Sequence, residues 1–222
     1  MAQSKLIMFD FDGVIADSLD GQCLACVETL RARGFAGLAT RAQFLDFTEA
    51  NWFSALAAAG VPEDVVEELE DAFGAVPSPE LFPEMAAVIE RLAAAHPVVI
   101  ITSSRTSVVE GILAEHGVRG VVDVIGGEQE ASKTRKIRDA RRRFGEALPA
   151  WYVCDTVGDI LEAREAGAGT VGVAWGWHGE ERLRRVRPDR MAHAPSDLLE
   201  LFCYGAFHPP GRVSGGLRSA LG

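Results

Sequence analysis

The sequence of 222 residues has little cysteine and no long apolar run. Four scattered cysteines are too few for a disulfide framework in a chain of this length. No apolar run approaches the roughly 18 residues of a membrane span. The apolar run Leu6–Phe9 follows the N-terminus so closely that no signal peptide is expected. We therefore expect a cytoplasmic protein without a membrane partner.

Positive charge is also scarce, above all in the first 90 residues. That segment holds 16 acidic residues, and its cations are Lys5, Arg31, Arg33 and Arg41. The whole chain has a net charge of -10. Binding to a phosphate backbone requires clustered cations, so a nucleic-acid partner is not expected. The basic run 135–143 has the spacing of a solvated helix face, which we favour over a binding patch.

Hydrophobic periodicity divides the chain into a helical segment and an alternating segment. After an apolar strand at 6–9, we expect helices at 20–33, 41–59 and 62–73, separated by glycine and proline. We then expect helices at 84–95, 106–116, 133–144 and 159–166, and strands at 98–101, 121–125, 151–154 and 170–174. Alternation of this kind is typical of an α/β fold, a parallel sheet with helices on both faces.

The helical segment is thus inserted after the first strand of a Rossmann-like core. We expect the core to comprise residues 1–15 and 80–202 and the inserted segment, a small all-helical cap, to comprise 16–79. Residues 203–222, rich in glycine, proline and serine, are expected to form a flexible tail.

Two carboxylates leave the first strand together. Asp10 and Asp12 follow the apolar run directly and point to the same side in extended chain, and Gly13 then lets the chain turn away. Asp and Gly are also common in simple turns, and Asp-x-Asp serves as a metal clamp in unrelated enzymes, so the rest of the chain has to decide. Two acids so placed suit a divalent cation, or a nucleophile with a proton carrier.

Two further segments carry groups that suit a phosphate. Thr102, Ser103 and Ser104 follow an apolar strand and precede a helix, where hydroxyls and amides bind phosphate oxygens; helix capping is the alternative, and we expect Ser104 to cap. Lys133 begins a helix, an electrostatically poor place for a cation. It could hold the charges of a phosphoryl group and an aspartate together, with Lys136 as a less favoured competitor.

The last pair of acids follows a third strand. Asp155 comes directly after the strand at 151–154, and Asp159 lies four residues later in the first turn of a helix. Either acid alone is most simply a helix cap. Both together favour oxygen coordination of a hard cation such as Mg²⁺.

Taken in order and spacing, these segments resemble the four motifs of the haloacid dehalogenase (HAD) superfamily. The matching residues are the run Asp10–Ser18, Thr102, Lys133 and the stretch Asp155–Asp159, and residues 163–167 and 173–176 are similar to phosphoglycolate-phosphatase-like members. Cys154 departs from the glycine usual before the fourth motif, and we expect it to be tolerated.

The resemblance implies a role for each motif residue. Asp10 would be the nucleophile, and Asp12 would protonate the leaving group and then activate water. Thr102 and Lys133 would bind phosphoryl oxygens. Mg²⁺ would be held by Asp10, the Asp12 main-chain carbonyl and Asp155, with Asp159 ligating directly or through water. Gly13, Ser103 and Arg41 are expected to contact the substrate.

The implied activity is hydrolysis of a small phosphorylated metabolite through an aspartyl-phosphate, by a monomer or homodimer. The alternatives are a phosphomutase of the β-phosphoglucomutase type, which would need more cations in the cap, and a regulatory module that is phosphorylated on aspartate with little turnover. Gln22, Trp52 and Phe53 could face the substrate, although aromatic residues in a helical cap are more often core.

Overall fold

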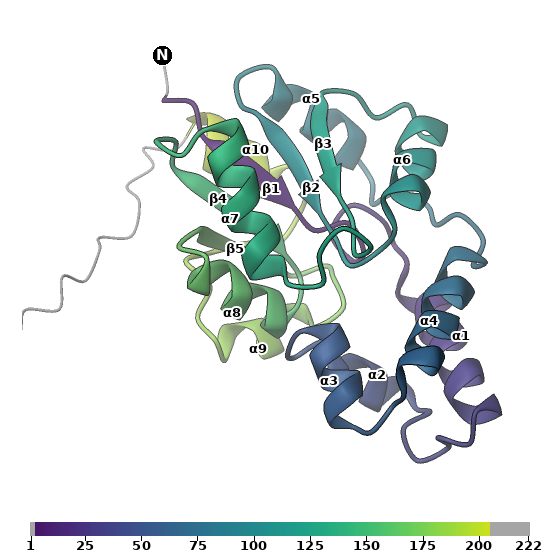
Figure 1. Cartoon of the computed structure of the whole chain (residues 1–222). Coiled ribbons are helices and arrows are strands. Elements are labelled where there is room, and N and C mark those ends of the chain that lie inside the picture. Colours follow the sequence, from purple (N-terminus) through teal and green to yellow (C-terminus); the bar gives the residue numbers. More distant parts are fainter. Residues whose placement is uncertain (1–2, 205–222) are drawn as a thin grey trace, which may run out of the picture.

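A computed structural model, which describes residues 3–204, contains a six-stranded sheet in which all neighbouring strands are parallel (Figure 1). The strands are β1 (Leu6–Phe9), β2 (Val98–Ile101), β3 (Val121–Ile125), β4 (Ala150–Cys154), β5 (Gly169–Val173) and β6 (Arg190–Ala192). Their order is β3-β2-β1-β4-β5-β6, and Phe9 is paired with Ile100 on one side and Val153 on the other. The carboxyl ends of β1, β2 and β4 therefore meet at one edge, and the α/β prediction is confirmed.

Helices cover both faces of this sheet. Along β1, Ile7 and Phe9 belong to one buried apolar cluster, and Leu6 and Met8 to another. Because strand side chains alternate, the two clusters lie on opposite faces. The first cluster is completed by α5 (Met85–Ala93), α6 (Thr106–Glu115) and α10 (Asp197–Leu199), and the second by α7 (Lys133–Phe144), α8 (Val157–Glu165) and α9 (Gly179–Arg184).

Four helices lie between β1 and residue 75 and have an apolar cluster of their own. They are α1 (Leu19–Ala32), α2 (Arg41–Phe47), α3 (Trp52–Ala58) and α4 (Glu63–Gly74), and they lie beyond the sheet edge at which α6 begins (Figure 1). We call residues 19–74 the helical unit. The expected boundaries between core and cap remain a prediction.

The single helix expected at 41–59 is wrong, because residues 48–51 separate α2 from α3. Asn51 caps α3, its side-chain oxygen accepting from the amide of Ser54 at 3.2 Å. The carbonyl of Thr48 accepts from the amide of Gly158 at 3.1 Å, at the start of α8. The break thus supplies a contact with the sheet-bearing part of the chain.

The region after β5 contains elements that were not predicted. Neither α9, β6 nor α10 was predicted, and residues Glu200–Tyr204 form a short π-helix. The predicted tail, 203–222, lies outside the described residues from residue 205 on. Within the described residues, no helix has both the length and the apolar character needed to cross a membrane.

Candidate active site

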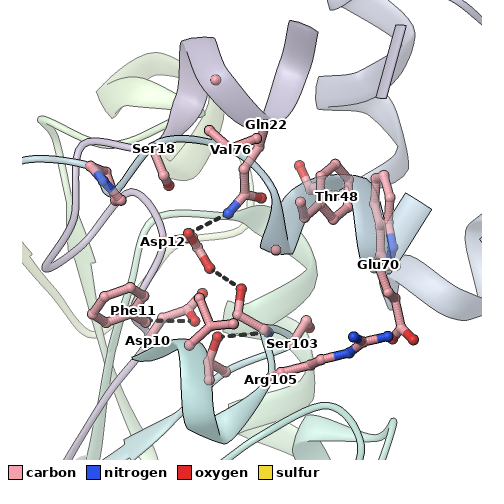
Figure 2. A pocket seen from close by; sticks show the side chains of 18 of the residues that line it. Asp10, Phe11, Asp12, Ser18, Gln22, Thr48, Glu70, Val76, Ser103 and Arg105 are labelled. Carbon is pink, nitrogen blue, oxygen red and sulfur yellow. Dashed lines mark hydrogen bonds between the residues drawn. The ribbon is translucent and has the colours of Figure 1, made fainter. Parts of the chain in front are cut away.

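The residues predicted at the strand ends come together at the carboxyl edge of the sheet. Asp10 follows β1, Thr102 follows β2, and Asp155 follows β4. A cavity of about 610 Å³ opens there, between this edge and the helical unit. Asp10, Asp12, Thr102, Ser103, Lys133 and Asp159 all line it, and Figure 2 shows the Asp10, Asp12 and Ser103 side chains together at one side of it.

Three carboxylates form a compact buried group. Asp10, Asp155 and Asp159 each offer an oxygen within 4.8 Å of the others, and all three side chains are buried. Oδ2 of Asp155 accepts from the backbone amide of Trp177 at 2.7 Å, whereas its buried Oδ1 has no hydrogen-bond partner. Burial raises the pKa of Asp155 to about 8. An unpartnered oxygen beside two other carboxylates fits a hard divalent cation such as Mg²⁺.

Two glycines allow the chain to approach this group closely. A Cβ on Gly176 would lie 2.2 Å from Cβ of Asp155, and Gly13 faces the same carboxylate with a φ of +74°. Side chains at either position would displace Asp155. The structure therefore places Gly13 against a candidate metal ligand rather than only at a turn.

Lys133 joins two of the carboxylates. Its Nζ lies 2.7 Å from Oδ2 of Asp10 and 2.8 Å from Asp159. Burial alone would lower the pKa of Lys133, but the two carboxylates outweigh it and hold the ammonium charged. Burial raises the pKa of Asp10 despite Lys133. Burial is also the largest effect on Asp159, but the attraction of Lys133 and the hydrogen bonds to Asp159 together outweigh it and lower the pKa. Ser132, which accepts from the amide of Arg135, caps α7 and so positions Lys133.

Asp12 is held apart from this group by neutral donors. Gln22 of α1 donates to its Oδ1, and Ser104 donates to its Oδ2 at 2.6 Å (Figure 2). Burial raises the pKa of Asp12, partly offset by the hydrogen bond from Ser104. A carboxyl group with a raised pKa beside, but outside, an acidic cluster suits a proton carrier.

The segment after β2 differs from expectation at one residue. Ser104 does not cap α6: the N-cap residue is Arg105, and Ser104 contacts Asp12 instead. Oγ1 of the buried Thr102 accepts from the amide of Ser104 at 3.0 Å, which fixes the turn. Lys136 does not reach the carboxylates; its buried Nζ donates to the carbonyls of Thr102 and Gly126.

Arg41 lies away from the cavity, contrary to the expectation that it contacts the substrate. Its side chain is 53% exposed and pairs with Asp20 at 2.5 Å. Arg41 is the first residue of α2, and the Asp20 with which it pairs lies on α1. The other three candidates of the helical unit, Gln22, Trp52 and Phe53, do line the cavity. Trp52 also packs edge-on against Phe44 and Phe47, so it is both core and wall.

His178, which was not predicted, connects the site to the helical unit. Its Nδ1 accepts from the amide of Val157, the first residue of α8, at 3.0 Å. Nε2 therefore carries the proton and lies 2.8 Å from Oγ1 of Thr48 and 3.0 Å from the carbonyl of Leu45. Arg182 adds ion pairs with Asp46 and, at 2.6 Å, Glu49. No motif pointed to His178, because its partners are 21 to 133 residues away in sequence.

Comparisons with known proteins agree with this geometry. The phosphoglycolate phosphatase of Vibrio parahaemolyticus is 27% identical over 91% of this chain and 97% of its own length. The phosphoglycolate phosphatase of Synechococcus elongatus is 27% identical over 88% of this chain and 96% of its own length. The solved structure of a haloacid dehalogenase-like hydrolase from Streptococcus pneumoniae has the same fold, with a TM-score of 0.72 and 24% identity over 91% of this chain and all of its own. The family model of haloacid dehalogenase-like hydrolases matches residues 7–164. The chain is therefore a member of the haloacid dehalogenase-like hydrolase family.

Proposed function

We propose that the protein is an Mg²⁺-dependent phosphatase that hydrolyses a small phosphomonoester through an aspartyl-phosphate on Asp10. The observation that carries the proposal is the separation of the two aspartates. Asp10 lies in the group of three carboxylates with the Lys133 ammonium 2.7 Å away, whereas Asp12 is held outside it by Gln22 and Ser104. One carboxylate is thereby suited to nucleophilic attack and the other to proton transfer.

In the proposed reaction, a carboxylate oxygen of Asp10 attacks phosphorus, and Asp12 gives its proton to the departing oxygen. Asp12 then takes a proton from the water that cleaves the acyl phosphate. Lys133 and the Thr102 hydroxyl hold phosphoryl oxygens, and Ser103 and Gly13 shape the space around them. Mg²⁺, held by Asp10, Asp155, Asp159 and the Asp12 carbonyl, would neutralise charge on the phosphoryl group.

The names of the relatives support this activity. Several curated relatives that span most of the chain are called phosphoglycolate phosphatase, which makes phosphoglycolate a substrate to test.

We propose that the helical unit is a cap that closes the cavity from above the strand ends. A cytoplasmic location, a monomer or homodimer, and the lack of a nucleic-acid partner stay predictions.

The two alternatives have less support. A mutase has to hold a second phosphate with cations, and of the residues described, Arg105 and Lys133 are the cations that line the cavity. A regulatory module that keeps its phosphate has no need of a proton carrier at Asp12 beside a cavity of about 610 Å³.

Release of inorganic phosphate tests the proposal. The purified protein should hydrolyse p-nitrophenyl phosphate and at least one small metabolic monophosphate with Mg²⁺, and EDTA should abolish the release. Asp155→Asn should bind Mg²⁺ more weakly, because the carboxylate with the unpartnered oxygen is lost. Release that is unchanged by EDTA, or no release from any phosphomonoester, would refute the proposal.

A further inference from the structure

The part of the cavity left for the leaving group is lined from α6, from residues 76–79 and from the helical unit. Asp10 and Lys133 fix the phosphoryl end, so the remainder of a substrate lies against these walls, which include α3 and α4. These helices contribute Trp52, Phe53, Glu70 and Phe73 to the lining. Glu70 and Phe73 are three residues apart on α4 and so share one helix face. On the side of α3 and α4, the leaving group therefore meets aromatic rings and one carboxylate.

The cations at the cavity are already paired with acids. Arg105 forms an ion pair with Asp71 at 2.7 Å, and its guanidinium also lies beside Glu70 (Figure 2). Lys133 is paired with Asp10 and Asp159. Among the described residues these are the cations that line the cavity, so no unpaired positive charge awaits an anionic leaving group.

Further negative charge lies on the same lining. Asp17 and Glu115, both exposed, join Glu70 there. Glu115 accepts a hydrogen bond from Ser78 at 2.8 Å, which leaves its charge in place. A carboxylate on the substrate would have to give up water without gaining a cation. An ammonium or an uncharged group would instead be attracted or accepted by the acid and the aromatic faces.

We propose that the leaving group of the substrate carries no negative charge, and that Glu70 is a specificity-determining residue that disfavours a carboxylate there. The inference rests on the proposed phosphatase function and narrows its substrate class to phosphomonoesters of neutral or cationic alcohols. This substrate class differs from phosphoglycolate, for which several relatives are named, because the leaving group of phosphoglycolate carries a carboxylate. Burial raises the pKa of Glu70, so its charge is already poorly hydrated and a second anion nearby is costly.

Three probes of nearly equal size isolate the charge. They are 2-aminoethyl phosphate, 2-hydroxyethyl phosphate and phosphoglycolate, which end in an ammonium, a hydroxyl and a carboxylate. Each is measured as an inhibitor of p-nitrophenyl phosphate hydrolysis, because a slow substrate and a non-substrate then both give an inhibition constant. We expect phosphoglycolate to bind at least tenfold more weakly than 2-hydroxyethyl phosphate, and 2-aminoethyl phosphate at least as tightly.

Two variants test whether Glu70 and its neighbours cause the difference. In wild type, the inhibition constant of phosphoglycolate should exceed that of 2-hydroxyethyl phosphate, and we call this ratio the gap. Glu70→Gln should reduce the gap at least fivefold. Asp71→Asn, at an exposed residue, should narrow it too, because Arg105 is released from its partner. Glu67→Gln makes the same charge change on an exposed position of α4 outside the cavity and should leave the gap as it is.

The outcomes separate this inference from the function on which it rests. If the aryl phosphate is not hydrolysed with Mg²⁺, the phosphatase proposal fails and the inference fails with it. If it is hydrolysed but phosphoglycolate binds tightest, with Glu70→Gln and Asp71→Asn unchanged from wild type, the charge inference is wrong while the phosphatase assignment stands.

Discussion

Gly13 faces the Asp155 carboxylate so closely that a Cβ on Gly13 would lie 2.0 Å from Oδ2 of Asp155. No real Cβ approaches an oxygen at that distance, so any side chain would push the carboxylate away. The same oxygen accepts from the amide of Trp177, and the other is the unpartnered one. Gly13 therefore determines where the carboxylate of Asp155, a candidate metal ligand, lies.

The first prediction is that Gly13→Ala lowers kcat/KM at least 100-fold and weakens Mg²⁺ binding, because Asp155 loses its position. Gly34→Ala is the matched control. Gly34 also has a positive φ, +86°, but a Cβ there meets nothing within 4 Å. It should share only the backbone strain of about 1–2 kcal/mol that an L-residue has in this conformation. Equal activity in the two variants would contradict this role of Gly13.

The second prediction concerns the contact between His178 and Thr48. His178→Ala removes buried hydrogen bonds to Val157, Thr48 and Leu45, and should lower the free energy of unfolding by about 1–3 kcal/mol. It should also raise KM, because the helical unit loses a connection to α8. Urea unfolding and steady-state kinetics measure the two effects.

His193→Ala is the control for that experiment. His193 is largely exposed and its one ion pair is with Glu180 at the surface. We expect His193→Ala to change the free energy of unfolding by less than about 0.5 kcal/mol and to leave KM unchanged. If His178→Ala behaved like the control, the hydrogen bonds of His178 between α8 and the helical unit would not contribute to stability or to substrate binding.

The third prediction is a pH dependence of stability caused by Lys136. Burial lowers the pKa of Lys136 from 10.5 to about 8. Between these values the unfolded chain binds a proton that the folded chain has lost, so the contribution of Lys136 to unfolding free energy rises with pH. Relative to that of Lys136→Met, the free energy of unfolding of the wild type should rise by on the order of 2–3 kcal/mol from pH 8 to pH 10.5.

Denaturant unfolding of both proteins at several pH values measures that difference. Comparison with the variant removes the contributions of other groups that titrate in the same range. A difference between wild type and Lys136→Met that stays constant from pH 7 to pH 10.5 would show that Lys136 is neutralised or hydrated in another way.

Much of the site could be predicted because parallel strands bring their carboxyl ends to one edge. An apolar run followed by Asp10, Thr102 or Asp155 is a local pattern, and the sheet does the rest. The strands at 6–9, 98–101 and 121–125 were predicted with the bounds observed. Lys133 was found because a cation at a helix start is electrostatically unusual.

The remaining features depend on contacts between distant segments. Ser104 looks like a helix cap in sequence, and only the fold places it 2.6 Å from Asp12. The break at 48–51 ends α2 where the chain meets Gly158, which helix periodicity does not record. The strand β6 has three residues, too few for an alternating pattern. Arg41 was selected for its charge, and sequence did not show that Asp20 pairs with it.

The measurement that tests the account most directly is the mass of the intact protein after reaction with an activated aryl phosphate. In Asp12→Ala, Asp10 should still be phosphorylated, because a phenolate leaves without a proton, while hydrolysis stalls for want of a base. Acid quench should reveal a gain of one phosphoryl group, together with a burst of phenol and slow turnover. Asp10→Asn in the same background should abolish the adduct. A full steady-state rate with no burst and no adduct in Asp12→Ala, or an adduct that survives Asp10→Asn, would contradict the assignment of Asp10 as nucleophile and Asp12 as proton carrier.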